Sequence, residues 1–132
     1  MLVFAGCATK TGAVAKPDER EILRNRVREF WDLQININLK NADRIYQYEV
    51  PAFREKFSLI EYVNRFKVIK YLEADIKQVE VEGVKGKVTV ASTYQVPFPH
   101  IANKKLTSTE VENWIRLEGT WYHIPKAFQM PE

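Results

Sequence analysis

The order of its patterns constrains this chain more than any single motif does. Three amphipathic helical stretches occupy the first half, and four strand-like runs follow them in the second half. The last two runs form a hairpin from Trp114 to Ile124, turning at Glu118-Gly119, where glycine supplies the positive φ of a tight turn. Helices followed by consecutive strands are typical of α+β domains. The sequence therefore predicts an α+β fold, with N-terminal helices packed on a curved, mainly antiparallel, four-stranded sheet.

The helical half carries clear start signals. The residues that can cap or open a helix or a helical turn are Asp18, Asn41, Pro51 and Ser58. The first helix is expected to run to about Leu39, because apolar side chains recur on one stripe. This stripe comprises Leu23, Val27, Phe30, Trp31 and Ile37. One face of the first helix should therefore be buried.

The second half alternates between apolar and polar residues, as strands with one buried face do. The four runs cover residues 72–82, 84–98, 105–117 and 120–124. The first run changes phase at Lys77-Gln78, and a one-residue shift of this kind is typical of a β-bulge, which bends a strand. Gly83 and Gly86 are expected to form the loop between the first two runs. A sheet bent in this way can enclose a pocket.

Pairing across the Glu118-Gly119 turn defines two faces of the hairpin. One face carries Ile115, Leu117, Tyr122 and Ile124, and the other carries Glu110, Glu112, Trp114, Arg116, Trp121 and His123. We expect the aliphatic face to pack against the helices, because apolar burial drives that contact. The aromatic and charged face would then need a cover of its own. Either a second copy of the chain or a ligand at the open end of the curved sheet could provide this cover.

Residues 1–17 resemble the end of a bacterial lipoprotein signal peptide followed by a tether. An apolar run closes on Ala5-Gly6-Cys7, and a polar stretch follows. The resemblance implies lipidation of Cys7, so that a domain of residues 18–128 would face the periplasm and touch the membrane only through this anchor. The alternative is that Cys7 is an ordinary thiol near the N-terminus of a cytoplasmic protein.

Charge and composition disfavour several classes of function. The 20 lysines and arginines are interleaved with 17 acidic residues for a net charge of +3, so no phosphate-binding stripe stands out and nucleic acid is not an expected partner. The arginines of the first helix are expected to form a solvated face. Two distant histidines and one cysteine offer no zinc-ligand spacing, and the glycines form no phosphate loop. No metal or cofactor is therefore expected.

Two short segments resemble the nuclear transport factor 2-like (SnoaL-like) superfamily. They are Val50-Pro51-Ala52-Phe53-Arg54 and the closing Gly119-Thr120-Trp121-Tyr122-His123-Ile124, within a likeness that covers Asp18 to Phe128. Members of this superfamily fold as a cone around a pocket, and many dimerise through the sheet. Some are isomerases, dehydratases or polyketide cyclases, while others only bind ligands or partners. The resemblance implies a cone-shaped fold for this chain and the same range of functions.

Several side chains are candidates for a pocket or an interface. They are Trp31, Tyr48, Tyr94, Glu112, Trp114, Trp121 and His123. None is assigned a catalytic role, because carboxylates on strands are usually solvated and His123 lacks a neighbouring nucleophile in the sequence. The favoured function is a non-catalytic, homodimeric envelope lipoprotein domain that binds a small apolar ligand or a protein partner. The alternative is a small isomerase or dehydratase that uses a pocket carboxylate or histidine.

Overall fold

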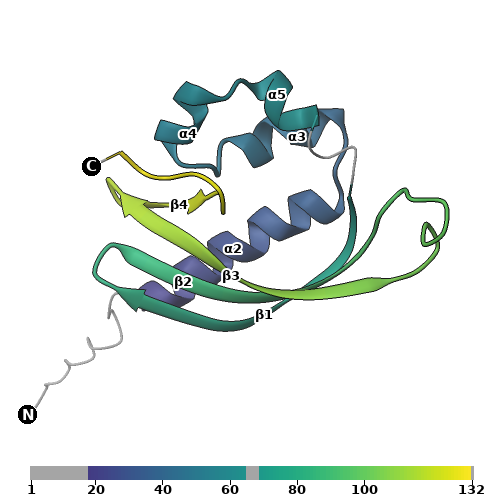
Figure 1. Cartoon of the computed structure of the whole chain (residues 1–132). Helices are drawn as coiled ribbons and strands as arrows, with labels where there is room; N and C mark the ends of the chain where they lie inside the picture. Colours follow the sequence, from purple (N-terminus) through teal and green to yellow (C-terminus); the bar gives the residue numbers. More distant parts are fainter. Residues whose placement is uncertain (1–17, 65–68, 132) are drawn as a thin grey trace, which may run out of the picture.

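The computed structural model describes residues 18–64 and 69–131, and it has an α+β fold (Figure 1). Four helices precede four strands in the chain. The helices are α2 (Glu19–Ile35), α3 (Leu39–Tyr46), α4 (Pro51–Lys56) and α5 (Leu59–Asn64). The strands are β1 (Lys70–Glu82), β2 (Lys85–Gln95), β3 (Leu106–Leu117) and β4 (Thr120–Ile124). The predicted fold class is confirmed.

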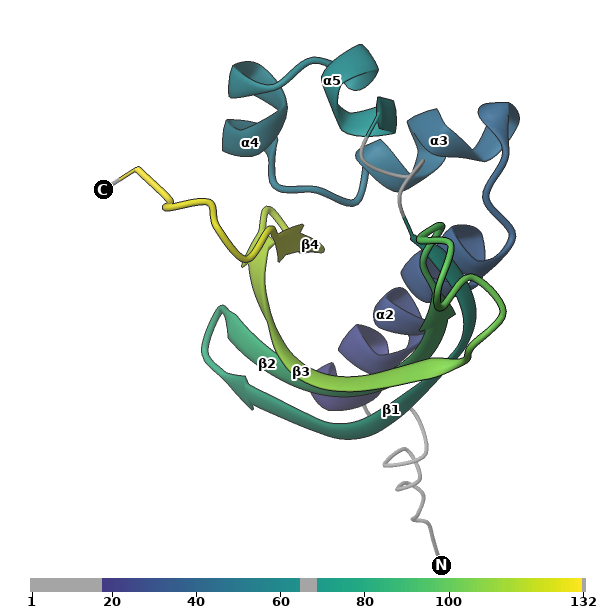
Figure 2. The ribbon, with the colours of Figure 1, turned by 45° about the vertical axis from the view of Figure 1, so that its right-hand side comes forward.

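The strands form one sheet in the order β1-β2-β3-β4, and every neighbouring pair is antiparallel. Figure 2 shows the sheet curving around α2, with α3, α4 and α5 beyond the open side of the curve. The pairing of β1 with β2 shifts register between Ile76 and Gln78, which confirms the predicted bulge. A second shift lies between Tyr71 and Glu73. These irregularities bend the long hairpin, since a bulge increases the local twist of a strand.

The ends of the helices follow local capping. Asp18 accepts a hydrogen bond from the Arg20 amide at 3.0 Å, as predicted, whereas α2 ends at Ile35 and not near Leu39. Asn38 caps α3 by accepting from the amides of Lys40 and Asn41, so the predicted cap at Asn41 is wrong. The side chains of asparagine compete with the backbone for hydrogen bonds, which explains why an asparagine-rich stretch interrupts the helix here.

The capping box at the start of α5 is confirmed. The Ser58 amide donates to Glu61 Oε1 at 2.8 Å, and the Glu61 amide donates to Ser58 Oγ at 3.2 Å. This reciprocal pair satisfies two amides that a helix start leaves without partners. It also fixes where the following residue, Tyr62, enters the core.

The predicted loop between the first two strands is shorter in the structure. Gly83 has a positive φ of 62° and lies in the turn, but Gly86 belongs to β2 and is buried. A Cβ atom at Gly86 would lie 2.5 Å from Leu23 Cδ2 and 3.2 Å from Trp121 Cζ3. Glycine is therefore needed at this position for the close approach of the helix and the sheet, and not for a turn.

The face of the hairpin that packs against the helices is the opposite of the one predicted. Trp114 and Trp121 are each 1% exposed and belong to the main core, while the aliphatic residues of the other face are only half-buried. An indole can be buried when its N–H finds a partner, and these two bond to Glu112 and Glu19. Large aromatic side chains then contribute more buried area than the aliphatic ones. These tryptophans offer no exposed surface for dimerisation, and the homodimer remains a prediction.

Arginines of α2 attach the helix to the sheet. Arg24 and Arg28 donate to the carbonyl oxygens of Ile76 and Ala74 in β1, and Arg26 donates to that of Trp121 in β4. The expectation of a purely solvated arginine face is therefore wrong for these residues. Arginine side chains often cover apolar surface with their stems while the guanidinium reaches a polar partner.

Cys7 and its neighbours lie outside the described residues. Within residues 18–64 and 69–131, no helix has the length and apolar character needed to cross a membrane.

Candidate functional site

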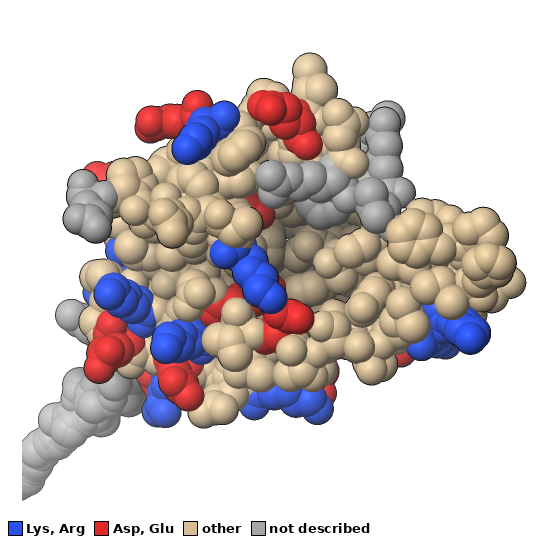
Figure 3. Space-filling model, viewed as in Figure 1, with Lys and Arg blue, Asp and Glu red and all other residues tan. Residues whose placement is uncertain are grey.

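Two adjoining cavities lie between the concave side of the sheet and the helices. The one lined by Val90, Tyr94 and other strand residues is called the outer cavity and has a volume of about 370 Å³; the one lined by Phe30, Gln34 and Tyr62 of the helices is called the inner cavity and has a volume of about 290 Å³. Their shared walls are Trp31, Ile69, Tyr71, Glu112, His123 and Lys126. Figure 3 shows the surface hollowed between the helices and the long β2–β3 hairpin. Volumes of this size suit a small organic molecule.

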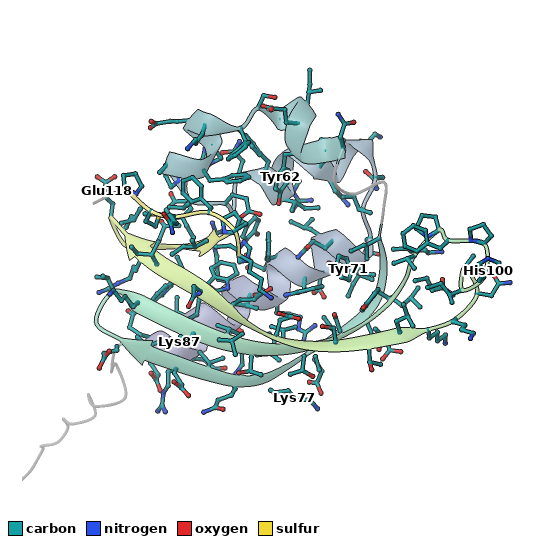
Figure 4. The ribbon with its side chains drawn as sticks, in the orientation of Figure 1. Tyr62, Tyr71, Lys77, Lys87, His100 and Glu118 are labelled. Carbon is teal, nitrogen blue, oxygen red and sulfur yellow. The ribbon has the colours of Figure 1, made fainter. Side chains whose placement is uncertain are left out.

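A hydrogen-bonded cluster of Glu49, His123 and Tyr62 borders the inner cavity. His123 Nδ1 lies 2.6 Å from Glu49 Oε1, and the Tyr62 hydroxyl donates to Glu49 Oε2 at 2.5 Å. Glu49 is only 3% exposed, and Tyr62 points from α5 toward the interior in Figure 4. Both carboxylate oxygens are therefore occupied by partners, which is the usual condition for burying a charge.

Backbone pairing brings Glu49 and His123 together. Residue 49 forms a single parallel bridge with residue 123 of β4. The Val50 amide donates to the His123 carbonyl at 2.9 Å, and the His123 amide donates to the Tyr48 carbonyl at 2.8 Å. Pro51 then opens α4 immediately after this bridge. The chain is therefore extended where Glu49 must face the sheet, and it returns to helix directly afterwards.

His123 is held by a hydrogen bond to Glu49 and by two aromatic rings. Burial alone would lower its pKa, but the carboxylates of Glu49 and, further away, Glu112 outweigh burial, and the net direction is upward. Since Nδ1 bonds to Glu49, the other ring nitrogen, Nε2, is available to the cavities. No group among the described residues is bonded to Nε2. The ring itself is fixed by Phe30, at 4.9 Å between centroids, and by Trp114, at 5.4 Å.

Glu112 presents a second carboxyl group to both cavities. Its Oε2 accepts from the Trp31 indole at 3.0 Å, and its Oε1 accepts from the Trp114 indole at 3.1 Å. Burial raises the pKa of Glu112, whereas the positive field of His123 and the two indole donors oppose that rise. The carboxyl group is therefore fixed in orientation and can exchange a proton closer to neutral pH than an ordinary glutamate.

Gln34 supplies the one buried polar atom without a partner among the described side chains. It projects from α2, is 8% exposed and lines the inner cavity, but its amide nitrogen Nε2 has no hydrogen-bond partner. An unsatisfied buried donor costs roughly 1–3 kcal/mol, so native proteins rarely keep one without a reason.

Aromatic rings form the wall of the outer cavity. Trp31 contacts Tyr71 edge to face at 4.9 Å between centroids, and Tyr71 contacts Tyr94 at 6.2 Å. Figure 4 shows Tyr71 pointing into the space between β1 and the helices. Burial is the main cause of the raised pKa of Tyr71, so its hydroxyl stays protonated at neutral pH. This wall can hold an apolar body by ring contacts.

The structure brings together four of the seven candidates predicted from the sequence. Trp31, Tyr94, Glu112 and His123 line the outer cavity. Trp114 and Trp121 belong to the core, and Trp114 reaches the site only through its bond to Glu112. Tyr48 lies apart from both cavities, where its hydroxyl bonds to Glu29 and Arg26 covers its ring at 3.9 Å.

Sequence reasoning did not identify Gln34, Glu49 or Tyr62 as site residues. Gln34 could have been found, because it follows Trp31 by three residues on the buried stripe of α2, where a polar side chain is unusual. Glu49 carries no such signal, because its partner His123 is 74 residues away. Tyr62 has the spacing of an ordinary core residue in α5. In the part of the chain that the structure describes, no cluster of His, Cys, Asp and Glu could hold a metal ion.

Comparison with known proteins shows likeness in structure but not in sequence. No protein-family model matches the chain, and no curated protein matches its sequence. A SEC-C motif containing protein from Rhodopseudomonas palustris superposes with a TM-score of 0.62 and 17% identity, over 76% of this chain and 73% of that one. Another, from Psychrobacter arcticus, superposes with a TM-score of 0.64 and 10% identity, over 92% of this chain and 69% of that one. At these identities the likeness shows the fold alone.

These matches correct the family inferred from the sequence. The solved structures are described as SEC-C motif proteins, so the assignment to the nuclear transport factor 2-like superfamily, in a bacterial lipoprotein, is wrong. The short segments behind that assignment have local explanations. Val50 pairs with His123, Gly119 adopts a positive φ of 83° in the turn, and Trp121 fills the core. The chain shares its fold with SEC-C motif proteins over most of its length.

Proposed function

We propose that this protein binds a small, largely apolar molecule in the two cavities between the sheet and the helices. The observation that carries the proposal is the combination of an aromatic wall with fixed polar groups, of which Gln34 Nε2 is buried and unsatisfied. Ligand sites are mostly apolar and contain a few convergent polar groups, whereas an ordinary core satisfies its polar atoms internally.

A titration with 2-ethylnaphthalene, followed by ¹H–¹⁵N NMR, tests binding. We expect saturable shifts at the indole N–H of Trp31, which lines both cavities. The indole N–H of Trp121 is the matched control, because it bonds to Glu19 and lines neither cavity. It should not move. Shifts of equal size at the two indoles, or none that saturate, would contradict the proposal.

Proton-transfer catalysis is a second candidate function, favoured by the arrangement of His123. Its Nδ1 is fixed by Glu49 while Nε2 remains without a partner, and Glu112 offers a carboxyl group on the same walls. A base oriented by a third group is the arrangement of general acid–base sites, where such a residue contributes about 10²–10⁴-fold in rate.

Hydrogen–deuterium exchange tests this second candidate. In D₂O the methyl protons next to the carbonyl of 2-acetylnaphthalene should exchange faster with the protein than in buffer. A base removes one of these protons, and a deuteron from the solvent replaces it. His123→Gln should slow the catalysed exchange by about 100-fold or more, while Glu80→Gln, an exposed residue of β1 that lines neither cavity, should not. Exchange at the buffer rate with the ketone bound would rule catalysis out.

A further inference from the structure

We infer that the ligand of the inner cavity presents a neutral oxygen acceptor, such as a ketone or amide carbonyl, to the amide nitrogen of Gln34. This inference rests on the proposed binding function and names the chemical class of the ligand. The starting point is that Gln34 lines the inner cavity while its buried Nε2 has no hydrogen-bond partner among the described residues. An N–H group is a donor only, so its missing partner must be an acceptor.

The two carboxylates that line the inner cavity already have donors of their own. Glu49 accepts from His123 and from Tyr62. Glu112 likewise accepts one indole N–H on each of its oxygens. Both acids therefore have defined partners in the folded protein. The donor of Gln34, in the wall of the same cavity, is left without an acceptor among the described residues.

The charges around the inner cavity favour a neutral acceptor over an anion. Glu49 and Glu112 both line the inner cavity, so a ligand carboxylate would add a third acidic group to a space of about 290 Å³. Like charges at short range in a poorly solvated site repel strongly. The Lys126 ammonium and the His123 ring do not offset this, because Lys126 is bonded to Glu110 at 2.8 Å and His123 to Glu49 at 2.6 Å.

A cationic ligand is disfavoured by the donors. Gln34 presents an N–H group, and His123, whose pKa is raised, carries a proton over a wider pH range than a free histidine. An ammonium group has no acceptor to offer to either of them. A carbonyl oxygen has two lone pairs and no charge, so it fits the donors without opposing the carboxylates.

The shape of the site assigns the two ends of the ligand. The outer cavity is walled by Trp31, Tyr71 and Tyr94, and it adjoins the inner one at the residues that line both. An apolar body in the outer cavity would therefore direct a polar end toward Gln34.

The dissociation constants of four compounds test the inference. All four share the naphthalene ring and differ only in the substituent at position 2. They are 2-acetylnaphthalene, 2-ethylnaphthalene, 2-naphthoate and 2-(aminomethyl)naphthalene. We expect the ketone to bind about tenfold more tightly than the hydrocarbon, since its carbonyl exchanges a hydrogen bond to water for one to a buried donor that has no partner in the free protein. The acid and the amine should bind more weakly than the ketone.

Substitution of Gln34 separates its effect on ligand binding from its effect on the stability of the protein. Gln34→Met keeps the length of the side chain and removes the unsatisfied amide, so the free protein should melt at the same or a higher temperature while the preference for the ketone disappears. Gln34→Glu, which exchanges the donor for an acceptor, should lose that preference and gain affinity for the amine. Gln78→Met, on the exposed side of β1, should keep the preference for the ketone.

The outcomes are distinguishable. A preference for the ketone that survives Gln34→Met, or a wild-type preference for the amine or the acid, overturns the inference. Equal binding of the ketone and the hydrocarbon also overturns it but leaves the proposed binding function standing. Failure of all four compounds to bind overturns both.

Discussion

Glu49→Ala should lower the free energy of unfolding by about 3 kcal/mol, because it leaves two buried partners without their acceptor. Tyr62 and His123 both bond to this carboxylate, and the side chain of Glu49 is almost entirely buried. A loss of this size should lower the melting temperature of a domain of this length by roughly 10 °C. Chemical denaturation and thermal melting measure both quantities.

The matched control for Glu49 is Glu110→Ala. Glu110 is also paired with a cation, Lys126, at 2.8 Å, but both side chains are exposed. Exposed ion pairs contribute little to stability because water and salt screen them. We expect no measurable change in melting temperature for this variant, and equal losses in the two variants would contradict a buried cluster.

The effect of Glu49→Ala should also depend on pH. The pKa of His123 is raised in the folded protein, so its stabilisation is complete below the unfolded-state value of about 6.5 and is lost as the pH rises through the higher folded-state value. Removing Glu49 removes the main cause of the rise and leaves burial, which acts in the opposite direction. The variant should therefore lose more stability at pH 6 than at pH 9. A loss independent of pH would show that His123 is not charged in the wild-type cluster.

Gly86→Ala should lower the free energy of unfolding by about 1–3 kcal/mol through overpacking. The added Cβ would lie 2.5 Å from Leu23 Cδ2 and 3.2 Å from Trp121 Cζ3, and both of these side chains are fully buried. In most strands the same change would be neutral or stabilising, because alanine loses less backbone entropy than glycine. A loss of stability, measured by urea denaturation, therefore reports the close contact between α2 and the sheet.

A double-mutant cycle tests whether the contact with Leu23 causes the loss of stability in Gly86→Ala. Leu23→Ala alone should cost about 2–5 kcal/mol, but it makes room for a methyl group at position 86. Gly86→Ala should cost clearly less in that background, with a coupling energy on the order of 1 kcal/mol. Lys87→Ala is the control, because this neighbour points away from the helices on the outer face of the sheet in Figure 4. An additive cycle would mean that Leu23 does not limit the space.

Local signals in the sequence proved reliable. The Ser58–Glu61 capping box and the bulge near Lys77-Gln78 are both present, because each depends only on neighbouring residues or on one strand. The positive φ at Gly119 was also predictable. Predictions were less reliable where several neighbouring residues could play the same local role. Asn38 and not Asn41 caps α3, since several asparagines in one stretch can serve.

The face of the hairpin was predicted wrongly because burial of an indole depends on an acceptor for its N–H group. Glu112, two residues earlier on β3, accepts from Trp114, and Glu19 in α2 accepts from Trp121. Neither pair can be inferred from hydrophobicity. Once both are satisfied, the larger aromatic area decides which face joins the core.

The sequence by itself determined the element types, their order and the bend in the long hairpin, because periodicity, caps and bulges are properties of short segments. The tertiary structure alone decided the site. Glu49 and His123 are 74 residues apart and become neighbours only through a single backbone bridge. The position of Gln34 on the buried stripe of the helix was visible in the sequence, but its place beside a cavity was not. Burial and pairing between remote segments are collective results of packing, and local patterns do not encode them.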